Sequence, residues 1–278
     1  MNTPRALRLG ALALPVLLTA CAGPPVRYEP EAWKPWQQRC ARAGVFIHRT
    51  VDNVEGVLLM KPRPARPNLD RQFDLDDPYG NDVGGDEYIA MFLRSARRSA
   101  LPPSPALPGI PPRAGYRYVE MVDPADGRRY RYSGELGPLP AAAIVPTDLP
   151  WLMKVGVGGR PVRTELPRAE FHLRREPAPG PAPRYGVTWE DISTREERQL
   201  WIAGSSLKVV DLQTGEVIAE RIGYMARMYR SDAPWHSATD YACPGFTRIP
   251  GDGLRFEGPP AQAGQTQVFV EQVLRPAP

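Results

Sequence analysis

Ser206-Leu-Lys-Val-Val-Asp-Leu-Gln-Thr-Gly-Glu-Val-Ile-Ala-Glu-Arg-Ile-Gly-Tyr224 carries the clearest structural signal of this chain. Gly215 closes a four-residue loop, Leu212–Gly215, between two runs rich in β-branched residues. A glycine at that place predicts a β-hairpin, because it adopts a positive φ without steric cost. The side chains expected to share the buried face of each strand are Leu207 and Val209 on the first, and Ile218, Ile222 and Tyr224 on the second.

Further strands are expected on both sides of this hairpin. Asp123–Gly127 predicts a second hairpin turn between two alternating runs, because Gly127 supplies a positive φ. Asp52-Asn53 predicts a turn, or a longer bend, between two apolar strands. The strands expected outside the first hairpin are Val45–Val51, Val54–Met60, Tyr116–Val122, Arg128–Tyr132, Leu152–Val157, Arg168–Arg174, Tyr185–Trp189, Trp201–Ala203 and Thr266–Leu274.

Three short helices are expected. Pro35–Ala43 has Pro35 near its first turn and Gly44 just beyond its end. Asp86–Arg97 is amphipathic and begins with acidic residues. Ser193–Gln199 begins with Ser193-Thr-Arg-Glu196, the spacing of a capping box.

Proline makes up 34 of the 278 residues, more than twice its usual share of about 5%. Its clusters predict long loops, of which Pro62–Gly85 is also rich in carboxylates. Hydrophobic residues still make up 42% of the chain, so a packed core is feasible. The sequence predicts an α+β fold: a β-rich single domain of antiparallel hairpins over residues 31–278, with a few short helices and long proline-rich loops.

The first residues of the chain form a charged and then apolar leader. Arg5 and Arg8 precede an apolar run from Leu9 to Ala20. This run is too short to cross a bilayer, because a transmembrane helix needs about 20 residues. The run ends in Leu18-Thr19-Ala20-Cys21. These four residues resemble the lipobox of bacterial lipoproteins position by position.

That resemblance implies a signal peptide over residues 1–20, a diacylglycerol on the Cys21 thiol and fatty acyl chains such as palmitate at the mature amino terminus. Two acyl chains give stable membrane anchoring. Residues 21–30 are expected to be a tether. Ala22, where some lipoproteins carry Asp, implies the outer membrane facing the periplasm, with the inner membrane left open. An ordinary secretory signal remains the alternative.

Cys40 and Cys243 are the two cysteines that remain once Cys21 is acylated. In an oxidising periplasm such a pair is expected to form a disulfide. Two free thiols are the alternative. Metal binding is disfavoured, because neither cysteine belongs to a Cys-x-x-Cys motif.

The charge distribution argues against nucleic acid as a partner. The formal net charge of +4 falls to +2 when Arg5 and Arg8 are removed, and no run of basic residues is present. The membrane, reached through the lipid anchor, and an envelope protein complex are the partners expected.

Several groups of residues are of types that form chemical sites, and each is better explained as structural. The acidic loop lacks the glycine spacing of an EF-hand, so whether it binds a cation stays open. The histidines are far apart, the serines lack a nucleophile elbow, and Gly156–Gly159 lacks the lysine of a phosphate loop. The tryptophans are expected mostly in the core. These groups are Asp70, Asp74, Asp76, Asp77, Asp82, Asp86 and Glu87; His48, His172 and His236; Ser205 and Ser206; Trp33, Trp36, Trp151, Trp189, Trp201 and Trp235.

The segments Cys40–Met60 and Tyr185–Tyr224 also resemble proteobacterial lipoproteins, a resemblance that implies no activity. The sequence predicts no catalytic residue, no metal ligand and no cofactor. The leading hypothesis is a non-enzymatic structural, scaffold or binding subunit of the envelope. An envelope hydrolase or metal-dependent enzyme, and a binder of glycans or small ligands through exposed aromatic rings, are the alternatives.

Overall fold

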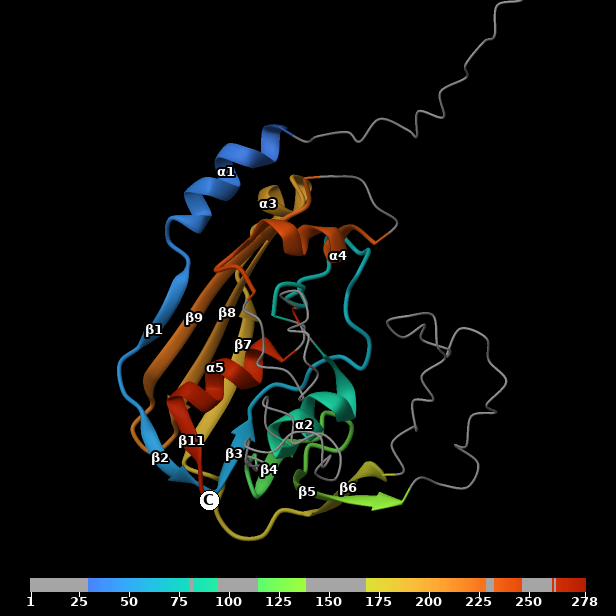
Figure 1. The fold of residues 1–278 in the computed structure, drawn as a ribbon, viewed down its shortest axis with the longest axis vertical. Coiled ribbons are helices and arrows are strands. Elements are labelled where there is room, and N and C mark those ends of the chain that lie inside the picture. Colours follow the sequence, from blue (N-terminus) through green and yellow to red (C-terminus); the bar gives the residue numbers. More distant parts are fainter. Residues whose placement is uncertain are drawn as a thin grey trace, which may run out of the picture.

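The computed structural model describes residues 30–80, 83–94, 115–138, 169–228, 233–246, 262 and 264–278 (Figure 1). The helices are α1 (Pro30–Cys40), α2 (Gly85–Arg94), α3 (Arg195–Gln199), α4 (Pro234–Ala238) and α5 (Gln265–Val273), and Thr239–Tyr241 is a 3-10 turn. The strands are β1 (Gly44–Ile47), β2 (Val51–Val54), β3 (Gly56–Leu59), β4 (Tyr118–Val122), β5 (Arg129–Pro138), β6 (Ala169–Pro177), β7 (Tyr185–Asp191), β8 (Ile202–Asp211), β9 (Glu216–Ala226), β10 (Ala242–Cys243) and β11 (Leu274–Pro276).

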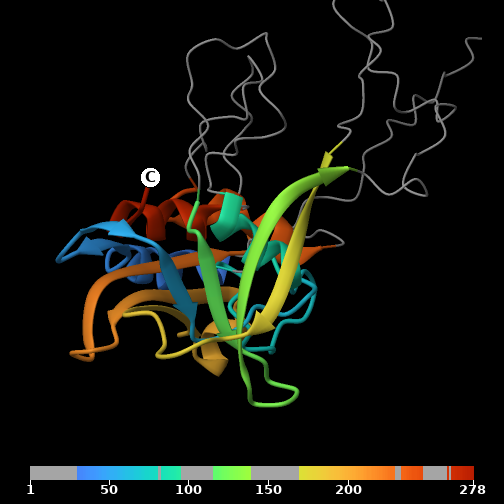
Figure 2. The ribbon, with the colours of Figure 1, turned by 90° about the horizontal axis from the view of Figure 1, so that it is seen from below.

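Nine of these strands form one sheet in the order β1-β9-β8-β7-β3-β4-β5-β6, with β10 beside β9. Most neighbours are antiparallel, but β3 is parallel to both β4 and β7. The sheet is strongly twisted, since β5 and β6 rise steeply from the direction of β8 and β9 (Figure 2). The predicted α+β, β-rich architecture is confirmed, and its parallel centre was not anticipated.

Both predicted hairpins are present. Asp211 pairs with Glu216 across the β8–β9 turn, where Gly215 has a φ of 75°. Val122 pairs with Arg129 across the β4–β5 turn, where Gly127 has a φ of 68°. In both turns the glycine occupies the left-handed region that the sequence pattern required.

The two faces of the sheet are covered differently. Helices α2 and α5 contribute to the main hydrophobic cluster on one face, together with side chains of β3, β4, β7 and β8 such as Val57, Val119, Val187 and Leu207. On the other face, α1 packs over the end of β8 and β9 near Ile202 and Tyr224. The same face also carries polar side chains, among which Ser206 on β8 donates to Glu220 on β9 at 2.6 Å.

The prediction that Ile218 shares a face of β9 with Ile222 and Tyr224 is wrong. The register between β8 and β9 shifts between Val209 and Val210, which pair with Ala219 and Val217. The extra residue turns Ile218 toward the main cluster, whereas Ile222 and Tyr224 face α1. A β-bulge of this kind reverses the alternation of side chains beyond it.

The predicted turn at Asp52-Asn53 is also wrong. These residues lie in β2, which pairs with β11 rather than with its neighbours in sequence. Within β2, Asn53 adopts a left-handed φ of 58°, and Glu55 is the one residue between β2 and β3. As a result β1 and β3 do not form a hairpin and lie apart in the sheet.

Helix boundaries differ from the prediction at two places. Helix α1 begins at Pro30 and ends at Cys40, so Pro35 lies inside it and not in its first turn. Packing of Ala32, Trp33 and Trp36 on the sheet offsets the hydrogen bond that Pro35 cannot donate. At α3 the capping box joins Thr194 to Glu197, one residue beyond the predicted pair.

The segment expected as a last strand, Thr266–Leu274, is mostly helical. It forms α5, followed by the short strand β11. Phe269, Val270 and Val273 are buried, and this spacing of one and four residues suits a helix face. Gly264, with a φ of 84°, precedes the helix.

Of the other predicted segments, some lie within the described residues and some lie outside them. Residues 62–80 and 83–84 form a loop, as predicted. The predicted amphipathic helix is described from Gly85 to Arg94 as α2, and Ile89 and Phe92 are buried on it. The expected strand Leu152–Val157 lies outside the described residues, as do Cys21, Asp82, Trp151 and Gly156–Gly159.

Candidate functional site

Helix α1 is fixed to the sheet by aromatic rings and by a disulfide. The rings of Trp33 and Trp36 lie 5.0 Å apart, and both meet the ring of Tyr241 edge-on at 6.2 and 6.0 Å. Cys40, the last residue of α1, is bonded to Cys243 on β10, with their Cα atoms 5.5 Å apart. The predicted disulfide is therefore present, and it joins residues 203 positions apart.

The membrane-anchor expectation concerns residues that precede α1. Among the described residues no helix has the length and apolar character needed to cross a bilayer. The described chain enters the body through α1, at the end of the molecule where α3 and α4 also lie (Figure 1).

Strand β1 follows α1 directly and forms one edge of the large sheet. It pairs with β9 and has no other neighbour in the described part of the sheet. Its three apolar residues are unusually accessible, with Val45 47%, Phe46 42% and Ile47 38% exposed. A free edge presents unpaired backbone donors and acceptors to any extended chain that approaches it.

Apolar side chains line both faces of this edge. Phe46 lies opposite Glu220 on the polar face of the sheet, while Val45 and Ile47 lie opposite Arg221 and Ala219 on the other face. Val217, further along β9, is 37% exposed. A strand added beside β1 would find apolar contacts above and below its own backbone.

The opposite edge, β6, has a different character. Arg174, Arg175 and Glu176 are exposed there, and β6 ends in Pro177. Arg175 pairs with Asp123 and stacks on the ring of Tyr130 at 3.6 Å. Charges and proline are the features by which proteins discourage pairing at a sheet edge, so β6 is protected and β1 is not.

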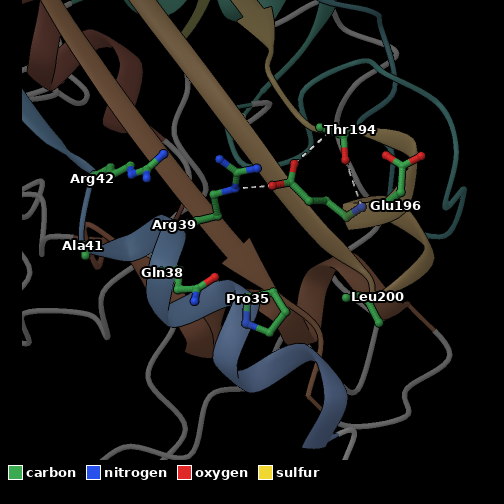
Figure 3. Close-up of a pocket in the computed structure, with 9 residues that line it drawn as sticks. Pro35, Gln38, Arg39, Ala41, Arg42, Thr194, Glu196 and Leu200 are labelled. Atoms are coloured by element: carbon green, nitrogen blue, oxygen red, sulfur yellow. Dashed lines mark hydrogen bonds and ion pairs between the residues drawn. The ribbon is translucent and has the colours of Figure 1, made fainter.

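An open pocket of about 750 Å³ separates α1 from α3 (Figure 3). Arg39 and Arg42 line the α1 side and Glu196 and Glu197 the α3 side, and Arg39 donates to Glu197 across it. Glu197 also accepts from the backbone of Thr194 at 2.8 Å. The Arg39–Glu197 ion pair joins the two helices across the pocket, and the nine residues that line it include neither an aromatic ring nor a histidine.

The described carboxylates of the acidic loop do not converge on one point. Asp74 pairs with Arg71, Asp76 accepts from Asn68 at 3.0 Å, and Glu87 pairs with Arg94. No group of three or more potential metal ligands gathers within the described residues.

Asp77 is the exception in that loop, because it is fully buried. Its carboxylate accepts from Arg63 at 2.9 Å and from the backbone of Gly80 at 2.9 Å. Burial raises the pKa of Asp77 to about 6, and the Arg63 guanidinium opposes that rise. Arg63 in turn lies over the ring of Trp189 at 4.1 Å.

A second ion pair continues this buried network. Asp191 at the end of β7 accepts from the backbone of Asp77 at 3.1 Å and pairs with the buried Arg198 of α3. The long loop is thereby attached to the sheet. The sequence indicates a structural role for Asp77 as one residue of the acidic loop, and the folded position of the loop shows that this aspartate is buried.

Asp211, before the β8–β9 turn, holds two arginines from distant parts of the chain. It accepts from Arg49 at 2.9 Å and from Arg184 at 2.8 Å. Hydrogen bonds from these guanidinium groups hold the pKa of Asp211 well below its usual range. The arrangement fixes the turn and the chain that follows β1.

The other candidate residues are spread over the molecule. His48 and His236 are exposed and His172 is half-buried on β6. Ser205 and Ser206 are buried within β8. No histidine in the described chain lies in a group that could bind a metal.

The described tryptophans contribute mainly to packing. Trp189 and Trp235 are buried, the rings of Trp201 and Trp235 lie 5.2 Å apart, and Trp33 and Trp36 pack beside the sheet. They do not line the α1–α3 pocket.

Comparisons with protein-family models, with curated proteins and with solved structures found no match to this chain. The unprotected edge at β1 is thus the feature of the described residues that points most directly to an interaction.

Proposed function

We propose that this chain is an envelope lipoprotein, acylated at Cys21, whose body acts as a non-enzymatic binding subunit on the periplasmic side of the outer membrane. The lipobox residues Leu18 to Cys21 support the anchor. The disulfide between Cys40 and Cys243 agrees with an oxidising compartment such as the periplasm. Ala22 supports the outer membrane.

The edge of β1 is the proposed binding surface, and it is the observation that carries the binding role. Val45, Phe46 and Ile47 are exposed on a sheet edge that lacks the charges protecting β6. In strand addition, main-chain hydrogen bonds supply affinity and pockets for alternate side chains supply specificity.

The partner is an extended segment of another envelope protein with apolar residues on both of its faces. A second copy of this chain fits less well, because two β1 strands of four residues each would bury little surface. Stable dimers bury on the order of 1,200 Å² or more. No described observation favours the hydrolase, metal-enzyme or glycan-binding alternatives.

The anchor is tested by Cys21→Ser in cells. Loss of the acylated thiol is expected to move the protein to the soluble fraction or to leave an uncleaved precursor, since the fatty chains provide the membrane affinity. Fractionation, acyl labelling and the mass of the amino-terminal peptide measure the outcome. A wild-type protein without acyl mass would contradict the anchor.

The binding edge is tested by placing a photoreactive phenylalanine analogue at position 46 in cells. We expect an adduct with a discrete envelope protein, and we expect that Val45→Lys abolishes it by adding a charge to the edge. Val122→Lys is the matched control, because Val122 is 45% exposed on β4 and Val45 is 47% exposed.

Position 176 on β6 serves as the control for the analogue itself. An adduct formed equally from positions 46 and 176, or unchanged by Val45→Lys, would contradict the proposed edge. An adduct with the mass of two copies of this chain would show that the edge binds a second copy of the chain and not another envelope protein.

A further inference from the structure

A second group of exposed apolar side chains lies in the loop between β3 and α2. Leu69 is 43%, Phe73 47% and Leu75 57% exposed. We call these three residues the loop patch. Exposed apolar residues concentrated in one short segment mark an interaction surface more often than isolated ones do.

In this loop the side chains of Asn68 and Gln72 bond to protein groups, while the apolar side chains of the loop patch are exposed. Gln72 donates to the carbonyl oxygens of Arg198 and Gln199 at the end of α3, at 2.7 and 3.1 Å. Asn68 donates to the carbonyl oxygen of Arg71 at 2.8 Å and to Asp76 at 3.0 Å. The backbone conformation is thereby fixed before any contact is made.

The loop patch belongs to the fixed part of this loop. Trp235 of α4 donates its backbone N–H to the carbonyl oxygen of Leu69 at 3.0 Å, and the guanidinium of Arg195 lies over the ring of Phe73 at 5.0 Å. Gln72, Asp74 and Asp76 are half-buried, while Phe73 and Leu75 between them are exposed. This alternation is the reverse of what a solvated loop needs.

The loop patch lies at the end of the molecule where the chain enters. Phe73 contacts α3, and α3 is joined to α1 by the Arg39–Glu197 ion pair. Figure 1 places α3, α4 and the first turn of α1 at one end, and β11 with the carboxyl terminus at the other. The apolar side chains and the attachment point of the amino-terminal segment therefore share one end.

We propose that the loop patch contacts the phospholipid surface to which the chain is anchored, an inference that rests on the proposed acylation of Cys21. Eight residues lie between Cys21 and Pro30, so the nine steps from one to the other reach about 30 Å when the chain is extended. The anchor keeps this end close to the lipid, so a patch of three side chains suffices, because the contact is intramolecular.

Charges around the loop patch do not call for an anionic lipid. Arg66, Arg71 and Arg195 are offset by Asp70, Asp74 and Asp76 in the same region. Contact through the apolar side chains should therefore persist at high salt, unlike contact through a basic patch.

The experiment uses the mature acylated protein carrying Leu75→Cys, labelled with a polarity-sensitive fluorophore. Cys40 and Cys243 are bonded, so the new thiol is the one that reacts once Cys21 is acylated. The protein is placed in vesicles of phosphatidylethanolamine and phosphatidylglycerol with nitroxide-bearing phospholipids. We expect a blue shift and loss of emission by quenching, both retained at high salt.

Gln213→Cys is the matched control, because Gln213 is exposed in the β8–β9 turn. That turn lies one ten-residue strand away from α3, about 33 Å. Its label should stay unquenched. Adding Phe73→Ser to the Leu75→Cys protein should reduce the quenching while leaving the acyl mass unchanged.

The outcomes separate this inference from the proposed function. Acyl mass present with an unquenched label at position 75 would overturn the lipid contact and leave the anchor standing. A label shielded in native membranes but not in these vesicles would assign the patch to a protein instead. Absence of acyl mass would overturn both.

Discussion

At the scale of single residues, Arg63 and Asp77 are notable because both side chains are inaccessible to solvent and pair with each other. Burying two charges costs several kcal/mol per ion, so such a pair is weak evidence of stabilisation. Removing Arg63 alone is expected to cost stability, because the Asp77 carboxylate then stays buried without its ion-pair partner.

Arg63→Met is therefore expected to lower the free energy of unfolding by about 3–5 kcal/mol, as for other broken buried pairs. Methionine keeps most of the side-chain volume over Trp189 while removing the charge. Urea denaturation followed by tryptophan fluorescence measures the change. Arg66→Met, an exposed position in the same loop, should alter stability by less than about 0.5 kcal/mol, and equal effects would contradict the role of the pair.

Asp211 leads to a prediction about pH. Its pKa is lower in the folded chain than in the unfolded chain because Arg184 and Arg49 donate to its carboxylate. Its contribution to stability is present above a pH of about 4 and is lost as the pH falls further. Asp211→Asn should thus destabilise the protein at neutral pH and flatten the decline in stability toward acid.

Urea denaturation at a series of pH values checks this prediction. Asp52→Asn provides the control, because Asp52 is an exposed carboxylate in an ion pair with Arg275. A variant at position 211 whose acid decline is as steep as that of the wild type would show that the two arginines do not act through this carboxylate.

At the scale of elements, the disulfide ties the end of α1 to β10. Replacing Cys40 and Cys243 together by serine should reduce the free energy of unfolding by up to about 5 kcal/mol, the loop-closure value for a loop of this length. The double variant avoids leaving one free thiol. The free energies of unfolding of the oxidised wild type and of the variant are compared by urea denaturation, and peptide mapping under non-reducing conditions checks that the wild-type disulfide is formed. Equal stability would show that the packing of the aromatic rings alone holds α1.

Local signals in the sequence predicted the turns well. Gly127 and Gly215 both lie at positive φ between paired strands, because a tight turn imposes that conformation whatever surrounds it. The pairing of Cys40 with Cys243 followed from counting thiols. Such features depend on few residues and little on the rest of the fold.

Elements decided by their surroundings were predicted less well. Thr266–Leu274 has the composition and alternation of a strand, yet most of it forms α5, because the helix buries Phe269, Val270 and Val273 against the sheet. Ile218 changed faces because of a bulge that only the partner strand β8 reveals. Neither outcome is encoded within its own segment.

At the scale of the whole molecule, the order of strands was beyond local reasoning. Val45, Phe46 and Ile47 look like core residues in sequence, and their exposure follows from the position of β1 at the edge of the sheet. The same holds for the candidate site, which was not predicted at all. The candidate site is indicated by the lack of a neighbouring strand beside β1 in the described fold, and this depends on the order of the strands in the sheet.

Strands β3, β4, β5, β7, β8 and β9 contribute buried side chains to one hydrophobic cluster with α2 and α5, so we expect one cooperative unfolding transition. Circular dichroism and tryptophan fluorescence should give coincident midpoints. Two resolved transitions in calorimetry would mean that the β4–β6 part of the sheet unfolds separately from β7–β9.

The place of β3 between β4 and β7 has a consequence for biogenesis. Both flanking strands come later in the chain than β3, and β1 likewise pairs with the much later strand β9. A chain that is synthesised from its amino end therefore cannot complete the central part of this sheet until most of its residues have emerged. High contact order of this kind slows folding, which would leave time for a chaperone to bind the unfolded chain.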